Sequence, residues 1–125
     1  MTSYHVIQHE WGLPPFDPSE PHLLPIEPLL NMCRSRTPQL LQLSDVCYRD
    51  RIVSMQRYRN CDVSQPGIVA ENAANPCEKR YRLLDGNHRV HKLIASGATT
   101  HRFYVLEPED FRHLVEKYDR RRHPR

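Results

Sequence analysis

Glycine is scarce in this chain, with 4 among 125 residues, and no apolar run is long enough to cross a membrane. Because a membrane-spanning helix needs about 20 predominantly apolar residues, the sequence predicts no membrane-embedded segment and no membrane partner. The N-terminus carries His5, His9 and Glu10 where a secretory signal would have an apolar core. We therefore expect a cytoplasmic protein without a signal peptide.

Motifs built from closely spaced cysteines are also missing. Cys33, Cys47, Cys61 and Cys77 are 14, 14 and 16 residues apart, so no Cys-x-x-Cys motif and no zinc-finger spacing is present. Cysteines in a reducing compartment stay reduced, and we expect four free thiols. The sequence shows no evident Ser–His–Asp or Cys–His pairing for covalent catalysis.

The composition indicates one small domain. Hydrophobic residues make up 38% of the chain, enough for a real but modest core. The net charge of +3 resides largely in Arg120–Arg122 and Arg125, so the rest of the chain is close to neutral. Such a tail can contact nucleic acid, although a solubilising chain end is the simpler interpretation.

Residues 1–21 hold Trp11, Phe16 and four prolines. Because proline lacks the amide N–H that helices and central strands need, we expect a proline-rich, extended N-terminal arm. Its aromatic side chains pack on their own domain or on a partner. The domain itself is expected over residues 22–106, followed by a C-terminal helix with a basic tail over 107–125.

Hydrophobic patterning and breaker residues predict the order of elements in the domain. The strongest strand signal lies at 99–106, which is rich in β-branched and aromatic residues. A helix is predicted from residue 107, because its apolar residues recur at helical spacing; these are Phe111, Leu114, Val115 and Tyr118. The other expected elements are a strand over 22–30 broken at Pro25, a loop over 31–38, a helix over 39–58 in one piece or two with a cap near Ser44 and Asp45, a turn over 63–67, a strand over 68–70, a loop over 71–79 and a strand over 80–84.

The stretch 81–97 organises the rest of the chain. Its first residues predict a strand, and Val90, Leu93 and Ile94 then recur at helical spacing. Between the two lies Asp-Gly-Asn at 85–87, a set of residues that favours a tight turn and a helix cap. The pattern predicts a strand, a turn and a helix in immediate succession.

A turn of this kind predicts an anion site, because a helix N-terminus points backbone N–H groups and positive potential at its ligand. We assign Gly86, Asn87, His88 and Arg89 to a phosphate cradle, with Lys92 one turn further along the helix. The alternative is a simple capped turn in which Arg89 pairs with a nearby carboxylate and Lys92 is solvated.

Arg34 and Arg36, which bracket Ser35 in a predicted loop, are further candidates for closing over a phosphate. Surface arginines often make no specific contact, so solvated side chains are the alternative.

A metal could in principle use His88 and His91 with Asp85, but three residues without a fourth ligand are a weak signal. A magnesium ion carried by a nucleotide, held by one acid and water, suits the sequence better. The candidate acids are Asp85 and Glu27.

Three motifs follow one another in an order that resembles the ParB/sulfiredoxin-like domains, over about residues 23–106. The Asp-Gly-Asn-His-Arg element is the specific part of the resemblance, and the two earlier pieces are weaker. The matching residues are Leu24-Pro25-Ile26-Glu27-Pro28-Leu29, Gln65-Pro66-Gly67-Ile68-Val69 and Leu84-Asp85-Gly86-Asn87-His88-Arg89, with Ser96-Gly97-Ala98 closing the helix.

The resemblance implies a compact α+β fold with a mixed sheet packed by helices. It also implies that the glycine-containing turn binds the phosphates of a nucleotide such as ATP, ADP or CTP, together with Mg²⁺. Members of this group include partitioning proteins that switch on CTP, ATP-dependent sulfiredoxins, free-serine kinases and ParB-like nucleases.

Individual residues narrow these branches. Sulfiredoxins carry a catalytic cysteine inside the turn, where this chain has Asn87, so we do not expect thiol chemistry. Partitioning proteins continue into a helix-turn-helix domain, which is not expected here. Free-serine kinases use a glutamate after the first strand, and Glu27 is the only acid in that stretch. Glu27, Asp85 and His88 are therefore our candidate catalytic residues.

The sequence thus predicts a small nucleotide- or phosphate-binding domain, with nucleotide-dependent phosphoryl transfer or hydrolysis as its chemistry. One alternative is a nucleic-acid-binding or nuclease-like protein that uses the same turn and the basic tail. Another is a non-catalytic interaction protein that acts through Trp11 and Phe16. A homodimer is one candidate assembly.

Overall fold

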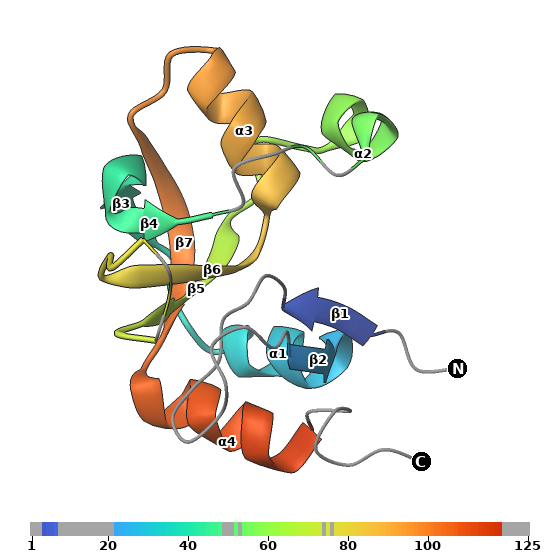
Figure 1. Cartoon of the computed structure of the whole chain (residues 1–125), viewed down its shortest axis with the longest axis vertical. Coiled ribbons are helices and arrows are strands. Elements are labelled where there is room, and N and C mark those ends of the chain that lie inside the picture. The colour runs from blue at the N-terminus through green and yellow to red at the C-terminus, as the bar shows by residue number, and fades with distance from the viewer. Residues whose placement is uncertain are drawn as a thin grey trace.

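The computed structural model describes residues 4–7, 22–48, 52, 54–73, 75 and 77–118. Figure 1 shows α2 and α3 at one end of a sheet and α1 and α4 at the other. The elements are β1 (Tyr4–Ile7), β2 (His22–Pro25), α1 (Ile26–Cys33), β3 (Gln39–Gln42), the 3-10 turn η1 (Leu43–Asp45), β4 (Val46–Cys47), α2 (Met55–Asn60), β5 (Gly67–Glu71), β6 (Tyr81–Asp85), α3 (Asn87–Ala95), β7 (Thr100–Leu106) and α4 (Pro108–Tyr118).

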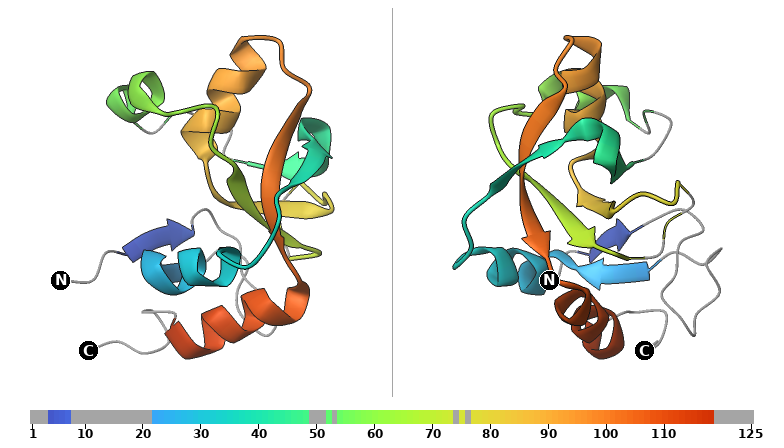
Figure 2. Two further views of the ribbon diagram at one scale, coloured as in Figure 1. Left: turned by 180° about the vertical axis from the view of Figure 1, so that it is seen from behind. Right: turned by 90° about the vertical axis from the view of Figure 1, so that its left-hand side faces the viewer.

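Five strands form a mixed sheet in the order β3-β7-β5-β6-β4. Strand β7 runs antiparallel to β3 and parallel to β5, whereas β6 runs antiparallel to β5 and parallel to β4. Figure 2 shows how this sheet twists between the two groups of helices. Strands β1 and β2 form a separate antiparallel pair. The predicted α+β fold, a mixed sheet packed by helices, is confirmed.

Strands β5 and β6 are buried on both faces. Ile68 and Ala70 pack in one cluster with α1 and α4, while Val69 between them packs in a second cluster with α3. Leu84 and Leu83 of β6 divide between the same two clusters. A strand that is covered on both faces has a nearly continuous apolar sequence. This is why the sequence locates both strands correctly.

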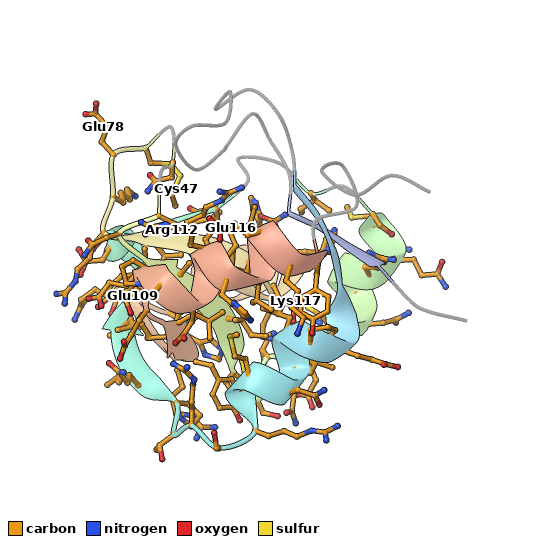
Figure 3. All side chains as sticks on the ribbon, turned by 90° about the horizontal axis from the view of Figure 1, so that it is seen from below. Cys47, Glu78, Glu109, Arg112, Glu116 and Lys117 are labelled. Atoms are coloured by element: carbon orange, nitrogen blue, oxygen red, sulfur yellow. A yellow bond between two sulfur atoms is a disulfide. The ribbon has the colours of Figure 1, made fainter. Side chains whose placement is uncertain are left out.

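Helix α4 covers the sheet with the face that the sequence predicts. Phe111, Leu114 and Val115 are buried, and Tyr118 packs against the same cluster. Arg112 and the other charged residues of α4 that are labelled in Figure 3 are exposed. The predicted strand over 99–106 and the helix after it are both confirmed.

The helix predicted over residues 39–58, in one piece or two, is wrong for residues 39–47 and is confirmed only over residues 55–58. Residues 39–42 form β3, which pairs with β7, and η1 and β4 follow before α2 begins at Met55. Leu41 and Leu43 are buried and two residues apart, which is the spacing of a strand rather than of a helix. Pairing with β7 therefore outweighs the helical propensity of the leucine and glutamine residues.

The strand predicted over 22–30 is too long. It stops at Pro25, and α1 begins at Ile26. Pro28 lies in the first turn of this helix, where a missing N–H removes no intrahelical hydrogen bond. The helix continues to Cys33, so the loop predicted over 31–38 is confined to its second half.

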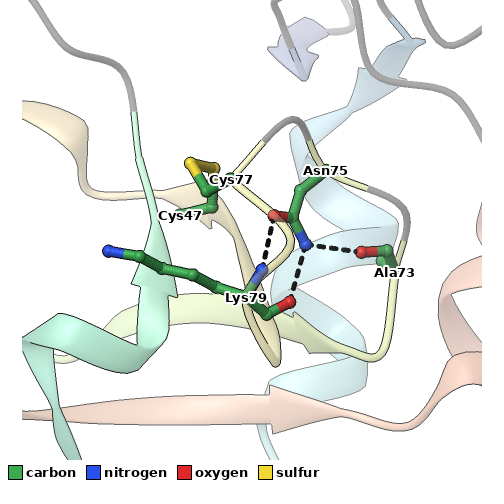
Figure 4. Close-up of a disulfide and its surroundings, with 5 residues drawn as sticks. All are labelled: Cys47, Ala73, Asn75, Cys77 and Lys79. Atoms are coloured by element: carbon green, nitrogen blue, oxygen red, sulfur yellow. Dashed lines mark hydrogen bonds between the residues drawn. A yellow bond between two sulfur atoms is a disulfide. The ribbon is translucent and has the colours of Figure 1, made fainter.

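A disulfide between Cys47 and Cys77 ties β4 to the loop that joins β5 and β6 (Figure 4). The expectation of four free thiols is therefore wrong for this pair, whereas Cys33 and Cys61 are free. The two bonded residues are 30 positions apart. Their pairing depends on how the β5–β6 loop folds back over β4, and a regular spacing along the chain does not report that.

The same loop is held by the side chain of Asn75. Its amide nitrogen donates to the carbonyl oxygens of Ala73 and Lys79, and its amide oxygen accepts from the backbone N–H of Lys79 (Figure 4). These bonds close the loop beside the disulfide.

Within the described residues, no helix is long and apolar enough to span a membrane. Strand β1 comes from the predicted N-terminal arm. The part of the arm that contains Trp11 and Phe16, and the basic tail at 119–125, lie outside the described residues.

Candidate functional site

Strand β6 leads through Gly86 directly into α3. Gly86 has a φ of 112°, in the left-handed region that glycine enters without steric cost. Its carbonyl oxygen accepts the first helical hydrogen bond, from the N–H of Val90 at 2.9 Å. The Val90 side chain is 1% exposed and fixes the helix on the sheet. The predicted strand, turn and helix over 81–97 are confirmed.

The guanidinium of Arg89 lies against this turn. Its Nη1 atom is 3.1 Å from the point where a β-carbon on Gly86 would stand. Its Nε and Nη1 atoms donate to the carbonyl oxygens of Asp62 at 2.9 Å and Pro66 at 3.2 Å. Both acceptors are neutral groups, and the charge of Arg89 also acts on the Asp62 carboxylate, as one of the causes that lower its pKa. The alternative in which Arg89 pairs with a carboxylate such as Asp85 stays a prediction.

Two further predicted phosphate ligands hold the backbone of the α2 segment. The Nζ atom of Lys92 donates to the carbonyl oxygen of Arg59 at 2.9 Å. The Nε2 atom of His88 accepts from the backbone N–H of Ser54 at 3.1 Å. Ser54, not Ser44, is the residue that caps a helix here, because its hydroxyl accepts from the N–H of Arg57.

Strand β7 holds the loop over residues 62–66 from the other side. The ring Nε2 atom of His101 is 2.9 Å from the carbonyl oxygen of Gln65, and Arg102 donates to that of Ser64 at 3.4 Å. His101 is 9% exposed. Its burial, and then the positive charges of Arg89 and Arg102, keep the pKa of its imidazole below the usual value. His101 and Arg102 were not among the predicted site residues.

The carboxylate of Asp62 is also engaged inside this loop. It accepts from the backbone N–H of Ser64 at 2.9 Å and from the Ser64 hydroxyl at 2.6 Å. These two bonds, chiefly the one from the hydroxyl, lower the pKa of Asp62. The loop is therefore held both by its own Asp62–Ser64 bonds and by the basic side chains around it.

The predicted acids lie on two different elements. Asp85 ends β6 directly before Gly86 and is half-buried, whereas Glu27 is exposed in the first turn of α1. Burial raises the pKa of Cys33 at the end of α1 to about 11, with Arg36 opposing the rise and Asp85 adding to it. The end of α1 thus lies within electrostatic reach of Asp85. Among the described residues, Glu27 makes no hydrogen bond to the turn.

Arg36 joins three elements. Its Nε donates to the carbonyl oxygen of Met32 at 2.9 Å, its Nη1 to that of Val105 at 3.1 Å, and its Nη2 to the carboxylate of Asp110 at 2.6 Å. These bonds connect α1, β7 and α4, so all three nitrogens of the guanidinium are used in structural contacts. Arg34 is exposed. The assignment of either residue to a phosphate stays a prediction.

The described residues include no cluster of three or more His, Cys, Asp or Glu side chains that suits a metal ion. A nucleotide-borne Mg²⁺ takes most of its ligands from phosphates and water and needs one or two carboxylates. The assignment of Asp85 or Glu27 to such an ion stays a prediction. No protein-family model, curated protein or solved structure matches this chain. The site is therefore defined by its own geometry.

Proposed function

We propose that this chain is a nucleotide- or phosphate-binding domain of the ParB/sulfiredoxin-like type, with the Gly86 turn as its anion site. The observation that carries the proposal is the Arg89 guanidinium, anchored beside the first turn of α3 by two neutral carbonyl groups. Arg89 brings its positive charge to the turn, where part of it acts on the Asp62 carboxylate, and the helix N-terminus adds positive potential of its own. Both favour a phosphate group.

The proposed ligand is ATP, ADP or CTP with Mg²⁺. Asp85, next to the turn, is the acid that we assign to the ion, and Glu27 is the second candidate. When bound, the ion neutralises the negative charge of the phosphates. The proposed chemistry is phosphoryl transfer or nucleotide hydrolysis, which depends mainly on positioning and charge.

His88 is the proton acceptor in this proposal. Its Nε2 atom accepts a hydrogen bond from Ser54 and is therefore unprotonated. A reaction that uses Nε2 as a base must first break that bond, which requires the N-terminus of α2 to move. His88 thus couples the proposed chemistry to the position of α2.

The test is thermal unfolding with ATP, ADP, CTP or GTP, each with and without magnesium. A ligand that binds the folded state must raise its unfolding temperature. We expect a shift for wild type and Arg112→Ala, whose substituted side chain is exposed on α4, and no shift for Arg89→Ala measured against its own baseline. The proposal fails if no nucleotide stabilises wild type at millimolar concentration, or if both variants respond equally.

A second candidate function is binding to the phosphate backbone of a nucleic acid. Arg57 and Arg59 are exposed in the last turn of α2, and the bond from Lys92 to the Arg59 carbonyl holds this helix next to α3. Arginine contacts to phosphates release counterions, so affinity falls steeply with salt. Fluorescence anisotropy with labelled single-stranded DNA and RNA tests this. A salt slope that the double change Arg57→Ala/Arg59→Ala leaves unaltered contradicts it.

We also propose the cytoplasm as the compartment of this protein. Thiol-reducing systems act there. The proposal therefore predicts that Cys47 and Cys77 are reduced in cells, and their redox state tests it.

A further inference from the structure

Strand β3 is an edge of the five-stranded sheet, and in the described part of the chain its only strand partner is β7. Three of its four residues are exposed. Leu40 is 68% exposed, the highest value among the exposed large apolar side chains of the described residues. The strand carries no charged residue. Natural edge strands are usually protected by short length, proline, charges, bulges or covering segments. Strand β3 is short and follows Pro38, but it has neither charge nor bulge.

The hydrogen bonds with β7 determine which backbone groups point outward. Leu43 donates to the carbonyl oxygen of Thr99 at 2.9 Å, which makes these two a hydrogen-bonded pair. Such pairs alternate along an antiparallel ladder, so Leu41 with His101 is the next one. Leu40 and Gln42 lie between the bonded positions. Their N–H and C=O groups therefore point away from β7, toward the open side of the sheet.

We propose that β3 pairs antiparallel with β3 of a second copy of this chain, across a two-fold axis beside Leu41. In this register, Leu40 of each copy lies opposite Gln42 of the other, and the two Leu41 residues face each other. The outward N–H and C=O groups of Leu40 and Gln42 are then all used, which gives a ladder of four backbone hydrogen bonds. The two sheets become one continuous sheet.

Self-complementarity selects a second copy as the occupant. A two-fold axis beside Leu40 would instead place Gln42 opposite Pro38, which has no N–H to donate. The axis beside Leu41 avoids this loss and places the two exposed Leu40 side chains as diagonal cross-strand neighbours, within the reach of large side chains. Leu40 thereby leaves water on the outer face of the joined sheet.

The strand is short, so the dimer is weak and depends on concentration. Stable complexes bury at least about 1,200 Å², which four residues on each side do not supply. We expect sedimentation velocity to show a shift from monomer to dimer between micromolar and millimolar protein.

Charge pairing tests the register. Because residue 40 of one copy faces residue 42 of the other, Leu40→Lys/Gln42→Lys places four positive charges at the contact, and Leu40→Lys/Gln42→Glu places two attractive pairs there. We expect the first double variant to stay monomeric and the second to dimerise at least as well as wild type. Met55→Lys, which changes a 54% exposed side chain on α2, is the control and is expected to dimerise normally.

Thermal unfolding of each variant verifies that it is folded, and the exposure of positions 40, 42 and 55 makes this the expected result. A wild type that stays monomeric at millimolar concentration overturns the proposal. So does a dimer that survives Leu40→Lys/Gln42→Lys. If both double variants dissociate equally, the register beside Leu41 is wrong.

Discussion

The Nη1 atom of Arg89 lies 3.1 Å from the point where a β-carbon on Gly86 would stand. The turn and the guanidinium therefore depend on each other. Gly86 provides a left-handed backbone and an empty space, and Arg89 fills that space while donating to Asp62 and Pro66. A β-carbon at position 86 would be in tight contact with the cation that we propose as the anion ligand, so Arg89 would have to shift.

Gly86→Ala tests this relationship. Alanine in a left-handed conformation costs about 1–2 kcal/mol, and its β-carbon would also push Arg89 away from the two carbonyl groups. Gly97→Ala is the matched control, because Gly97 has a φ of 90° but nothing within 4 Å of its β-carbon position. We expect Gly86→Ala to lower the free energy of unfolding more than Gly97→Ala, as measured by urea denaturation.

The difference between the two substitutions should shrink in an Arg89→Ala background, since the crowding is then gone. A double-mutant cycle measures this coupling directly. Equal effects of Gly86→Ala in both backgrounds would contradict the proposed contact.

The basic side chains of α3 should control the mobility of the α2 segment. Lys92→Met removes the bond to Arg59, and Arg89→Gln removes the fork that joins the carbonyls of Asp62 and Pro66. Loops with fewer anchoring bonds open more often. We therefore expect faster amide hydrogen exchange over residues 54–66 in both variants. Exchange over β7 should not change, and uniformly faster exchange throughout the protein would show general destabilisation instead.

Sequence patterns predicted the elements whose environment is simple. Strands β5 and β6 are covered on both faces and read as apolar runs, and α4 shows its buried stripe directly. The prediction for residues 39–47 failed because β3 pairs with β7 and β4 pairs with β6, strands that lie far along the chain. The disulfide was missed for the same reason. Pairings between residues far apart in the sequence leave no signal in the local pattern.

The candidate site was partly predictable. The Asp-Gly-Asn turn and the helix after it follow from local chemistry, which the sequence reports well. Local chemistry does not predict the partners of His88, Arg89 and Lys92. These partners are backbone groups of the segment 54–66, and every residue has such groups. His101 was missed since it lies inside a strand pattern that reads as apolar core.

Stability should fall in mild acid because of His101. Its pKa is lowered from 6.5 in the folded protein, chiefly by burial, so the unfolded chain takes up this proton first. The folded state therefore loses stability as the pH falls below about 6.5. His101→Gln keeps a side-chain donor for the carbonyl of Gln65 and removes the titration. Urea denaturation from about pH 7.5 to about pH 5.5 should show a smaller loss for this variant than for wild type.

The other histidines are the same in both proteins, so the comparison isolates His101. Parallel losses of stability in wild type and His101→Gln would show that a different group is responsible.

Cys77→Ser should lower the free energy of unfolding by about 3–4 kcal/mol, because the disulfide to Cys47 closes a loop of some 30 residues in the unfolded chain. Cys61→Ser is the control, since Cys61 is a free, half-buried thiol that donates weakly to the carbonyl oxygen of Tyr58. Denaturation with and without a reducing agent provides the measurement. The reductant should bring wild type down to the level of Cys77→Ser and leave the variant unchanged.

The same bond links stability to compartment. Reducing systems of the cytoplasm keep most protein thiols free, so a cytoplasmic location predicts that Cys47 and Cys77 both react when cells are lysed directly into denaturant with an alkylating agent. Air-oxidised purified protein should instead protect the two residues and label Cys33 and Cys61 alone. Protection of Cys47 and Cys77 in freshly lysed cells would contradict the cytoplasmic assignment, because the pair would then be oxidised where the protein works.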